Sequence, residues 1–186
     1  MKNYIMTFIL LTMAVAIYLQ TSLVELSETI AVTVLKNKDE IKSVHQERNI
    51  SKSKEYYLDQ ISFQANGNHL YHHAHGNIGY KEHYFIDFNS SFTTKDSAVY
   101  QFSISSDDGF ALYIDNKLIC QHANDRPLTK SMCSVELKAG AHDFKLNYFQ
   151  GYGNVGLVAL YKDIKEHQFQ PVGLDSNNLS FNRQNH

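Results

Sequence analysis

The stretch that decides the fold is YQFSISSDDGFALYI, residues 100–114. Its first part alternates apolar and polar residues as a half-buried β-strand does, and its last part is a second run of β-forming residues. Between them lie two adjacent acids, Asp107 and Asp108, followed by Gly109. A solvated turn is the commoner role of Asp-Asp-Gly, although two like charges repel at close range. A hard cation removes that repulsion, so this hairpin corner is also a candidate metal site.

Length and composition favour one β-rich domain with an appendage. The chain has 186 residues, of which 43% are hydrophobic and 19% charged, and this is enough for one well-buried core. Its 12 tyrosines, 11 phenylalanines and 2 prolines favour strands over disorder. The net charge of −2 gives no reason to expect a nucleic-acid partner.

The two cysteines, Cys120 and Cys133, flank a polar segment that is typical of a long loop. A disulfide across it would contribute roughly 3 kcal/mol by restricting the unfolded chain. Two buried free thiols are the alternative, and the spacing fits no compact zinc knuckle. We favour the disulfide if the chain is exported.

The first residues suggest export. Residues 1–22 hold one lysine, Lys2, and then a run from Tyr4 to Leu19 that is apolar apart from two threonines. This segment is interpreted as a signal anchor in the membrane or as a cleaved signal peptide, with a buried core helix as the weaker alternative. Either targeting role places the remainder in the periplasm or at the cell exterior, membrane-anchored or secreted, where disulfides persist.

Residues 23–54 are expected to form a helical stalk and a linker. Leu23, Leu26, Ile30 and Val34 recur at helical spacing, and the composition then turns charged and polar up to residue 54. No sustained heptads follow, so a coiled coil is not predicted. The stalk helix would be a surface for protein partners.

Residues 55–165 are expected to form an antiparallel β-sandwich, and residues 166–186 a polar C-terminal tail from which Leu174, Leu179 and Phe181 pack back. Short β-rich runs separated by turn formers favour a sandwich or barrel over βαβ units. The expected strands are 56–61, 84–88, 98–105, 111–114, 117–120, 134–137, 142–149 and 156–161.

Three motifs in order resemble one known family. Residues 100–117 are similar to its strand, Ser-Asp-Asp-Gly, strand, Asp-Asn turn, strand pattern; residues 85–100 resemble the segment before it, and residues 137–149 its glycine, histidine and aromatic-strand segment. The family is the protective-antigen-type (PA-fourteen) β-sandwich domain of toxins, glycosidases, flocculins and adhesins. The resemblance covers about residues 58–162 and implies an all-β antiparallel sandwich, here preceded by the N-terminal anchor and stalk helix.

The resemblance also implies a calcium site. In lectin members the two aspartates are joined by a cis peptide and bind one calcium ion, which here assigns Asp107 and Asp108 as ligands. A later loop supplies an amide oxygen and backbone carbonyls, which here are Gln150 and the carbonyls of Tyr152 and Asn154. Calcium accepts such oxygens and can leave positions open for two sugar hydroxyls. The side chains of Tyr152 and His122 would then discriminate between sugars.

A second candidate metal site is the run His72-His73-Ala74-His75, since imidazole binds zinc, nickel and copper. The nearby glycines suggest a loop, so we expect a solvated loop and no site. Catalysis has little support, because the sequence has no nucleophile elbow and adjacent acids are too close for the paired carboxylates of a glycosidase.

The sequence therefore predicts a calcium-dependent carbohydrate-binding domain, lectin-like or adhesin-like, that is tethered to a membrane and faces out of the cytoplasm. Its expected partners are a glycan or polysaccharide and, through the N-terminal segment, the membrane. It is not expected to be an enzyme. The alternative is a non-catalytic structural or protein-interaction module of a cell-surface or envelope assembly.

Overall fold

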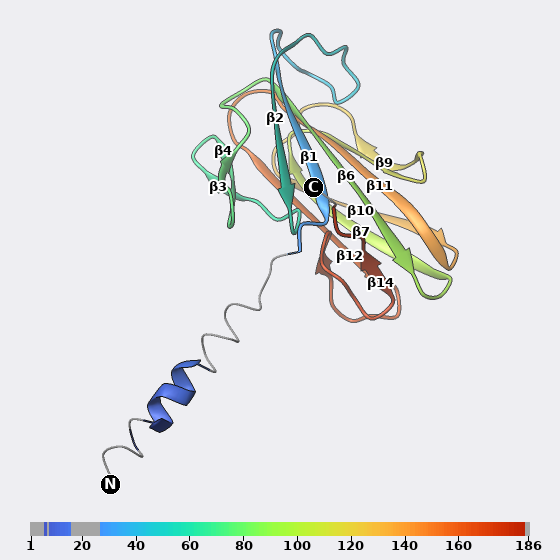
Figure 1. Cartoon of the computed structure of the whole chain (residues 1–186). Coiled ribbons are helices and arrows are strands. Elements are labelled where there is room, and N and C mark those ends of the chain that lie inside the picture. The colour runs from blue at the N-terminus through green and yellow to red at the C-terminus, as the bar shows by residue number, and fades with distance from the viewer. Residues whose placement is uncertain (1–5, 7, 16–26, 185–186) are drawn as a thin grey trace.

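The computed structural model describes residues 6, 8–15 and 27–184: residues 6 and 8–15 are helical, and residues 27–184 form a β-sandwich (Figure 1). The strands are β1 Ile30–Asn37, β2 Ile50–Leu58, β3 Gln64–Asn66, β4 His69–His72, β5 Gly76–Ile78, β6 Tyr84–Thr94, β7 Ala98–Asp107, β8 Phe110–Ile114, β9 Lys117–His122, β10 Thr129–Leu137, β11 Gly140–Gln150, β12 Gly156–Asp163, β13 Gln170–Pro171 and β14 Leu179–Phe181.

Two antiparallel sheets pack face to face, as the sequence predicts. The 7-stranded sheet has the order β2-β1-β6-β11-β8-β9, with β14 also paired to β6, and the 4-stranded sheet has the order β10-β7-β12-β13. A 3-stranded sheet, β3-β4-β5, lies beside them. Aromatic residues that point inward from the facing strands, among them Phe88, Phe102 and Tyr161, are buried and belong to the core between the two sheets.

The expected helical stalk is wrong where the structure describes it. Ile30–Asn37 is strand β1, which lies between β2 and β6 in the larger sheet and pairs with both. Ile30, Val32 and Val34 are buried in alternation, so their true period is two. β-branched residues also favour a strand. Residues 23–26 lie outside the described residues, and a partner surface on a stalk helix loses its basis.

The domain is also longer than residues 55–165. The linker assigned to residues 36–54 contains most of β2, and the polar tail contains β13 and β14, which pair with β12 and β6. Leu179 and Phe181 pack into the core as expected, while Leu174 is half-buried. Strand pairing therefore holds both ends of the segment 28–184 in one domain.

The targeting segment lies mostly outside the described residues. Within residues 6, 8–15 and 27–184, no helix has the length and apolar character that crossing a bilayer requires. Membrane attachment through residues 1–22 stays a prediction.

The disulfide is confirmed. Cys120 in β9 and Cys133 in β10 are bonded, with their Cα atoms 6.0 Å apart. β9 ends the larger sheet and β10 ends the smaller one, so the bond joins the two sheets at one side of the sandwich. A covalent link between edge strands limits their separation when the domain opens.

Candidate functional site

The two aspartates lie at the corner between β7 and β8. Asp107 ends β7, Phe110 begins β8, and the peptide bond between Asp107 and Asp108 is cis, as the resemblance implies. The two side chains are only 7% and 6% exposed. The Ser106 hydroxyl donates a hydrogen bond of 2.7 Å to the Asp108 carbonyl and holds the corner from behind. The pair therefore belongs to the packed end of the sandwich and is not a solvated turn.

Backbone N–H groups face both carboxylates. Gly151 N–H donates to Asp108 Oδ2 at 2.7 Å, and the backbone N–H groups of Arg126 and Leu128 stabilise the charged forms of Asp108 and Asp107, respectively. Burial acts against these donors and is the larger effect, so the pKa of Asp107 is raised and the pKa of Asp108 is raised to about 6. Two desolvated carboxyl groups lie side by side, and a cation would stabilise their negatively charged forms.

Arg126 supplies a positive charge close to the pair. Its guanidinium donates to Ser106 Oγ and Ser131 Oγ at 2.9 Å each and lies 5.3 Å from the centroid of the Phe110 ring. Its charge lowers the pKa of Asp107, although burial of that carboxyl outweighs it. Arg126 therefore balances part of the negative charge from the side of Asp107.

The loop after β11 lies against Asp108, as the resemblance implies. Gln150 ends β11 fully buried, its Oε1 accepts a hydrogen bond of 2.6 Å from the Tyr148 hydroxyl, and its Nε2 donates to the Asn154 carbonyl at 2.6 Å. The same Tyr148 hydroxyl contacts the Asp107 carbonyl. The amide of Gln150 is thus connected to the aspartate corner through Tyr148, and it also shapes the loop 150–154.

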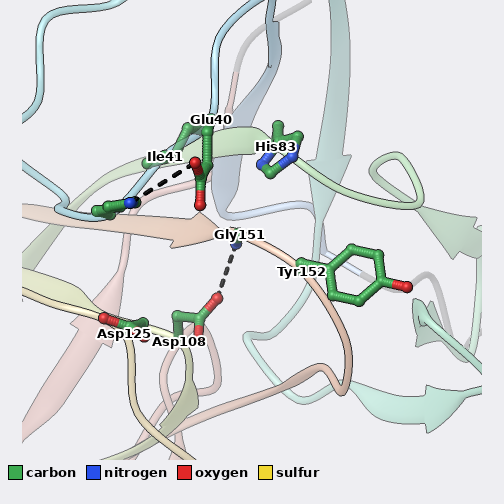
Figure 2. A pocket seen from close by; sticks show the side chains of 8 residues that line it. Glu40, Ile41, His83, Asp108, Asp125, Gly151 and Tyr152 are labelled. Carbon is green, nitrogen blue, oxygen red and sulfur yellow. Dashed lines mark hydrogen bonds and ion pairs between the residues drawn. The ribbon is translucent and has the colours of Figure 1, made fainter.

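Asp108 opens into a polar cavity of about 340 Å³, a size that suits a small ligand. Figure 2 shows Asp108 and Asp125 on one side of it and Glu40 opposite, with Gly151 between them. The Nδ1 atom of His83 is buried with no hydrogen-bond partner among the described residues. The residues that line the cavity are Glu40, Ile41, Lys42, His83, Asp108, Asp125, Gly151 and Tyr152.

The loop 38–49, between β1 and β2, forms one wall of this cavity, and it was assigned to the linker from the sequence. Ile41 and Val44 are 2% and 4% exposed and pack on Phe85 and Phe149. Val44 N–H also donates to the Ala123 carbonyl at 2.8 Å. The two isolated apolar residues in a charged segment were the available signal that this loop docks on the domain.

Two residues expected to discriminate between sugars occupy different positions. Tyr152 lines the cavity, is 75% exposed and extends its ring away from Asp108 (Figure 2). His122 lies at the end of β9, paired with Phe110, and is not part of the cavity lining. The structure therefore brings Tyr152 to the cavity and leaves the His122 side chain outside it.

A comparison with protein families decides the identity of the fold. The profile described as PA14 domain matches residues 47–167. The chain belongs to the PA14 domain family. A search of curated protein sequences finds no match.

Solved structures of PA14 domains share the fold at low sequence identity. The PA14 domain of the antifreeze protein MpAFP superposes with a TM-score of 0.62 and 10% identity over 78% of this chain and 87% of that chain. The PA14 sugar-binding domain from an RTX adhesin gives 0.59 and 11% over 78% and 94%. The epithelial adhesin 9 A domain from Candida glabrata, in complex with Galβ1-3GlcNAc, gives 0.55 and 9% over 79% and 87%. These similarities show that the chain has the same β-sandwich fold.

The histidine run of this PA14 domain differs from the solvated loop that the sequence suggested. His72 ends strand β4 and is fully buried, so the prediction is wrong for this residue, whereas His73 and His75 are exposed in the following turn. Burial, followed by the charge of His73, lowers the pKa of His72, so its imidazole is neutral near pH 7. β4 contains Leu70 and Tyr71, which favour a strand, but the histidines at its two ends obscured this pattern in the sequence.

Proposed function

We propose that this PA14 domain is a calcium-dependent carbohydrate-binding module that is displayed outside the cytoplasm. The observation that carries the proposal is a pair of nearly buried adjacent carboxylates that opens, through Asp108, into a polar cavity. Two structural neighbours support it by analogy: the PA14 sugar-binding domain from an RTX adhesin, and the epithelial adhesin 9 A domain in complex with Galβ1-3GlcNAc. The disulfide supports an oxidising compartment.

The chemistry of the residues around the corner supports calcium as the ion. The site offers carboxylate, amide and carbonyl oxygens, which calcium accepts in shells of about six to eight ligands. Asp107 and Asp108 would hold the ion, with Gln150 Oε1 and the carbonyls of Tyr152 and Asn154 as further ligands. Bound calcium would supply open positions for two hydroxyl groups of a sugar. Burial is the main cause of the raised pKa of both carboxyl groups, so their negative charges lack stabilisation that a bound cation would supply.

The chain's own side chains would position the sugar. Glu40, Lys42 and Asp125 surround the cavity with hydrogen-bonding groups, and Glu40 and Lys42 are paired at 3.6 Å. Tyr152 offers an exposed aromatic face, on which the apolar face of a sugar ring can pack. Polar groups at the rim and a ring at one side are suited to binding. We therefore propose a binding domain and not an enzyme.

The experiment that tests the proposal is a calorimetric titration of the full chain with neutral mono- and disaccharides, including Galβ1-3GlcNAc and lactose, in calcium and again in EDTA. We expect binding of at least one sugar in calcium and none in EDTA. Binding that is equal in both solutions would overturn the dependence on calcium, and calcium uptake without any sugar binding would overturn the lectin role.

A second candidate function is a structural or protein-interaction module without an ion. The position of Arg126 favours it, because its guanidinium already balances part of the charge of Asp107. Under this alternative the aspartates only shape the corner, and calcium leaves the melting temperature of the protein unchanged.

Calcium stabilisation is expected to depend on pH through Asp108. Its pKa is raised from 3.8 to about 6, so protons compete with calcium below about pH 6. The sign for the ion-free protein follows: a raised folded pKa gives stability that is complete below the unfolded value of 3.8 and is lost as the pH rises through about 6. The increase in melting temperature on adding calcium should therefore be larger at pH 7.5 than at pH 5. An equal increase at both pH values would contradict the assignment of Asp108.

A further inference from the structure

A cluster of three metal-ligating side chains lies at the small sheet, away from the aspartate corner. Asp59 directly follows β2, His72 ends β4, and His73 begins the turn to β5. One ligand atom from each of the three lies within 4.8 Å of the others. Asp59 and His72 are 4% and 0% exposed, whereas the His73 side chain is 44% exposed. The cluster therefore joins a buried carboxylate and a buried imidazole to a third ligand at the surface.

The distances in this cluster are longer than those of hydrogen-bonded pairs. His72 Nε2 lies 3.3 Å from Asp59 Oδ1, and His73 Nε2 lies 3.3 Å from Asp59 Oδ2. In the same protein the hydrogen-bonded pair His142 Nδ1 and Asp115 Oδ2 is 2.7 Å apart. Charge-assisted hydrogen bonds usually measure about 2.7–2.9 Å. The two imidazoles thus face Asp59 without closing on it.

The same distances fit a metal ion between the ligands. Zinc in proteins is usually tetrahedral, with bonds of about 2.0–2.2 Å to imidazole nitrogen and carboxylate oxygen, and neighbouring ligand atoms of such a shell are roughly 3.3 Å apart. This spacing matches the 3.3 Å from His72 Nε2 to Asp59 Oδ1 and the 3.3 Å from His73 Nε2 to Asp59 Oδ2, so an ion held by both imidazoles would face both carboxylate oxygens.

We propose that Asp59, His72 and His73 form a binding site for a first-row transition-metal ion of the zinc class. Ions of this class prefer imidazole and carboxylate ligands, whereas calcium prefers a shell made only of oxygen atoms. A further imidazole, that of the exposed His75, lies in the turn after β4, with its ring centroid 5.5 Å from that of His72. This site is separate from the proposed calcium site.

The separation follows from the strand register. Ile30 pairs with Leu58 at one end of the β1–β2 hairpin, and Asn37 pairs with Ile50 at the other. Asp59 follows the first end, while the loop 38–49 that lines the Asp108 cavity joins the second. Metal bound at Asp59 would instead connect the larger sheet to the small β3-β4-β5 sheet, because Asp59 and the histidines come from these two sheets.

The outer nitrogens of both imidazoles have neighbours. His73 Nδ1 lies 3.4 Å from the amide nitrogen of Gln60, and with this amide turned over its oxygen would accept from Nδ1–H, as outer ligands of metal-bound histidine do. His72 Nδ1 accepts from Ala74 N–H at 3.3 Å. His72 Nε2 also lies 3.3 Å from the Gln60 carbonyl oxygen. Metal binding through His72 Nε2 moves the imidazole proton to Nδ1, so both of these long contacts are exchanged for a coordinate bond. The exposed turn 73–75 is the segment that adjusts.

The test is a calorimetric titration of the full chain with zinc chloride, with calcium kept in excess. We expect one zinc ion per chain and an affinity at least about tenfold lower in Asp59→Asn and in His73→Gln, because each removes one ligand. His73 is exposed, so His73→Gln is expected to fold, which circular dichroism checks. The matched control is His142→Gln, which removes an imidazole from a hydrogen-bonded His–Asp pair and should leave zinc binding unchanged.

X-ray absorption at the zinc edge then identifies the ligands. We expect a shell of nitrogen and oxygen at about 2.0–2.2 Å with the outer-shell scattering of imidazole, weakened in His73→Gln. Sub-stoichiometric zinc, or equal zinc affinity in wild type and His73→Gln, would overturn the proposal and leave the cluster as a hydrogen-bonded network. Because calcium is present throughout, this outcome is independent of the calcium site.

Discussion

Replacing either aspartate by its amide, Asp107→Asn or Asp108→Asn, is expected to lower calcium affinity about a hundredfold or more. Both side chains are nearly buried, so an ion held between them is largely desolvated and depends on their charges. Removing one partner of a buried charge pair costs about 3–5 kcal/mol, which is a factor of a hundred or more in affinity. The amides keep the shape of the side chains, so the fold is expected to remain. Calorimetric titration with calcium chloride measures the effect.

The matched control for these variants is Asp125→Asn. Asp125 lines the same cavity and its charge raises the pKa of Asp108, but it is exposed and is not assigned as a ligand. We expect its calcium affinity to fall only severalfold, since charges in water are well screened. If all three variants lost the same amount, the aspartates would act through the general charge of the cavity, and their assignment as ligands would be wrong.

Gly109→Ala is expected to destabilise the domain by about 3 kcal/mol or more, at the upper end of the range for added atoms in a packed region. A Cβ atom at Gly109 would lie 2.6 Å from the His122 carbonyl oxygen, 2.6 Å from Phe149 Cε1 and 2.7 Å from the Asn124 carbonyl oxygen. Two of these neighbours are backbone atoms, which cannot turn aside. The glycine of the Asp-Asp-Gly motif is thus required by the close approach of β8 to the segment 122–124.

A second glycine provides the control for this steric effect. A Cβ atom at Gly156 would lie 2.9 Å from Leu128 Cδ1, the end of an exposed side chain that can rotate away. Gly156→Ala should therefore cost less than about 1 kcal/mol. Urea unfolding of both variants measures the difference. Equal stability of Gly109→Ala and wild type would contradict the packing around the corner.

The strands on either side of the aspartate corner, β7 in the smaller sheet and β8 in the larger one, were predictable because their signals are local. Alternation in residues 100–104, the turn at Gly109 and the aromatic strand before Gln150 fix β7, β8 and β11, and the resemblance then fixes their arrangement. The family match over residues 47–167 confirms this part of the interpretation.

Strand β1 was missed because its pattern fits two periods. Ile30 and Val34 are four residues apart, which suits a helix, and they are also two steps of a strand that includes Val32. The choice is made by pairing with Phe88 and Tyr56 on neighbouring strands, and such long-range partners leave no local signal. The same reason explains β14. Its three residues form a strand because β6 extends past the end of β1 and leaves residues 92–94 free to pair on that side.

The cavity wall and the contact of Asp59 with the histidine run were not predicted, for a related reason. Residues 38–49 are charged and polar, and only their docking on Phe85 and Phe149 makes them part of the site. Asp59 and His72 are 13 residues apart and meet because β2 and β4 belong to adjacent sheets. The spacing of Asp59 and His72 in the sequence does not predict that their side chains come together.

The most direct test of the calcium-binding claim is the electron density of crystals of the full chain grown with calcium chloride. We predict one ion at the corner between β7 and β8, bound by the carboxylates of Asp107 and Asp108 at about 2.3–2.6 Å, with Gln150 Oε1 among its ligands. Density that holds only water beside the two aspartates, with Arg126 as their counter-charge, would contradict the account.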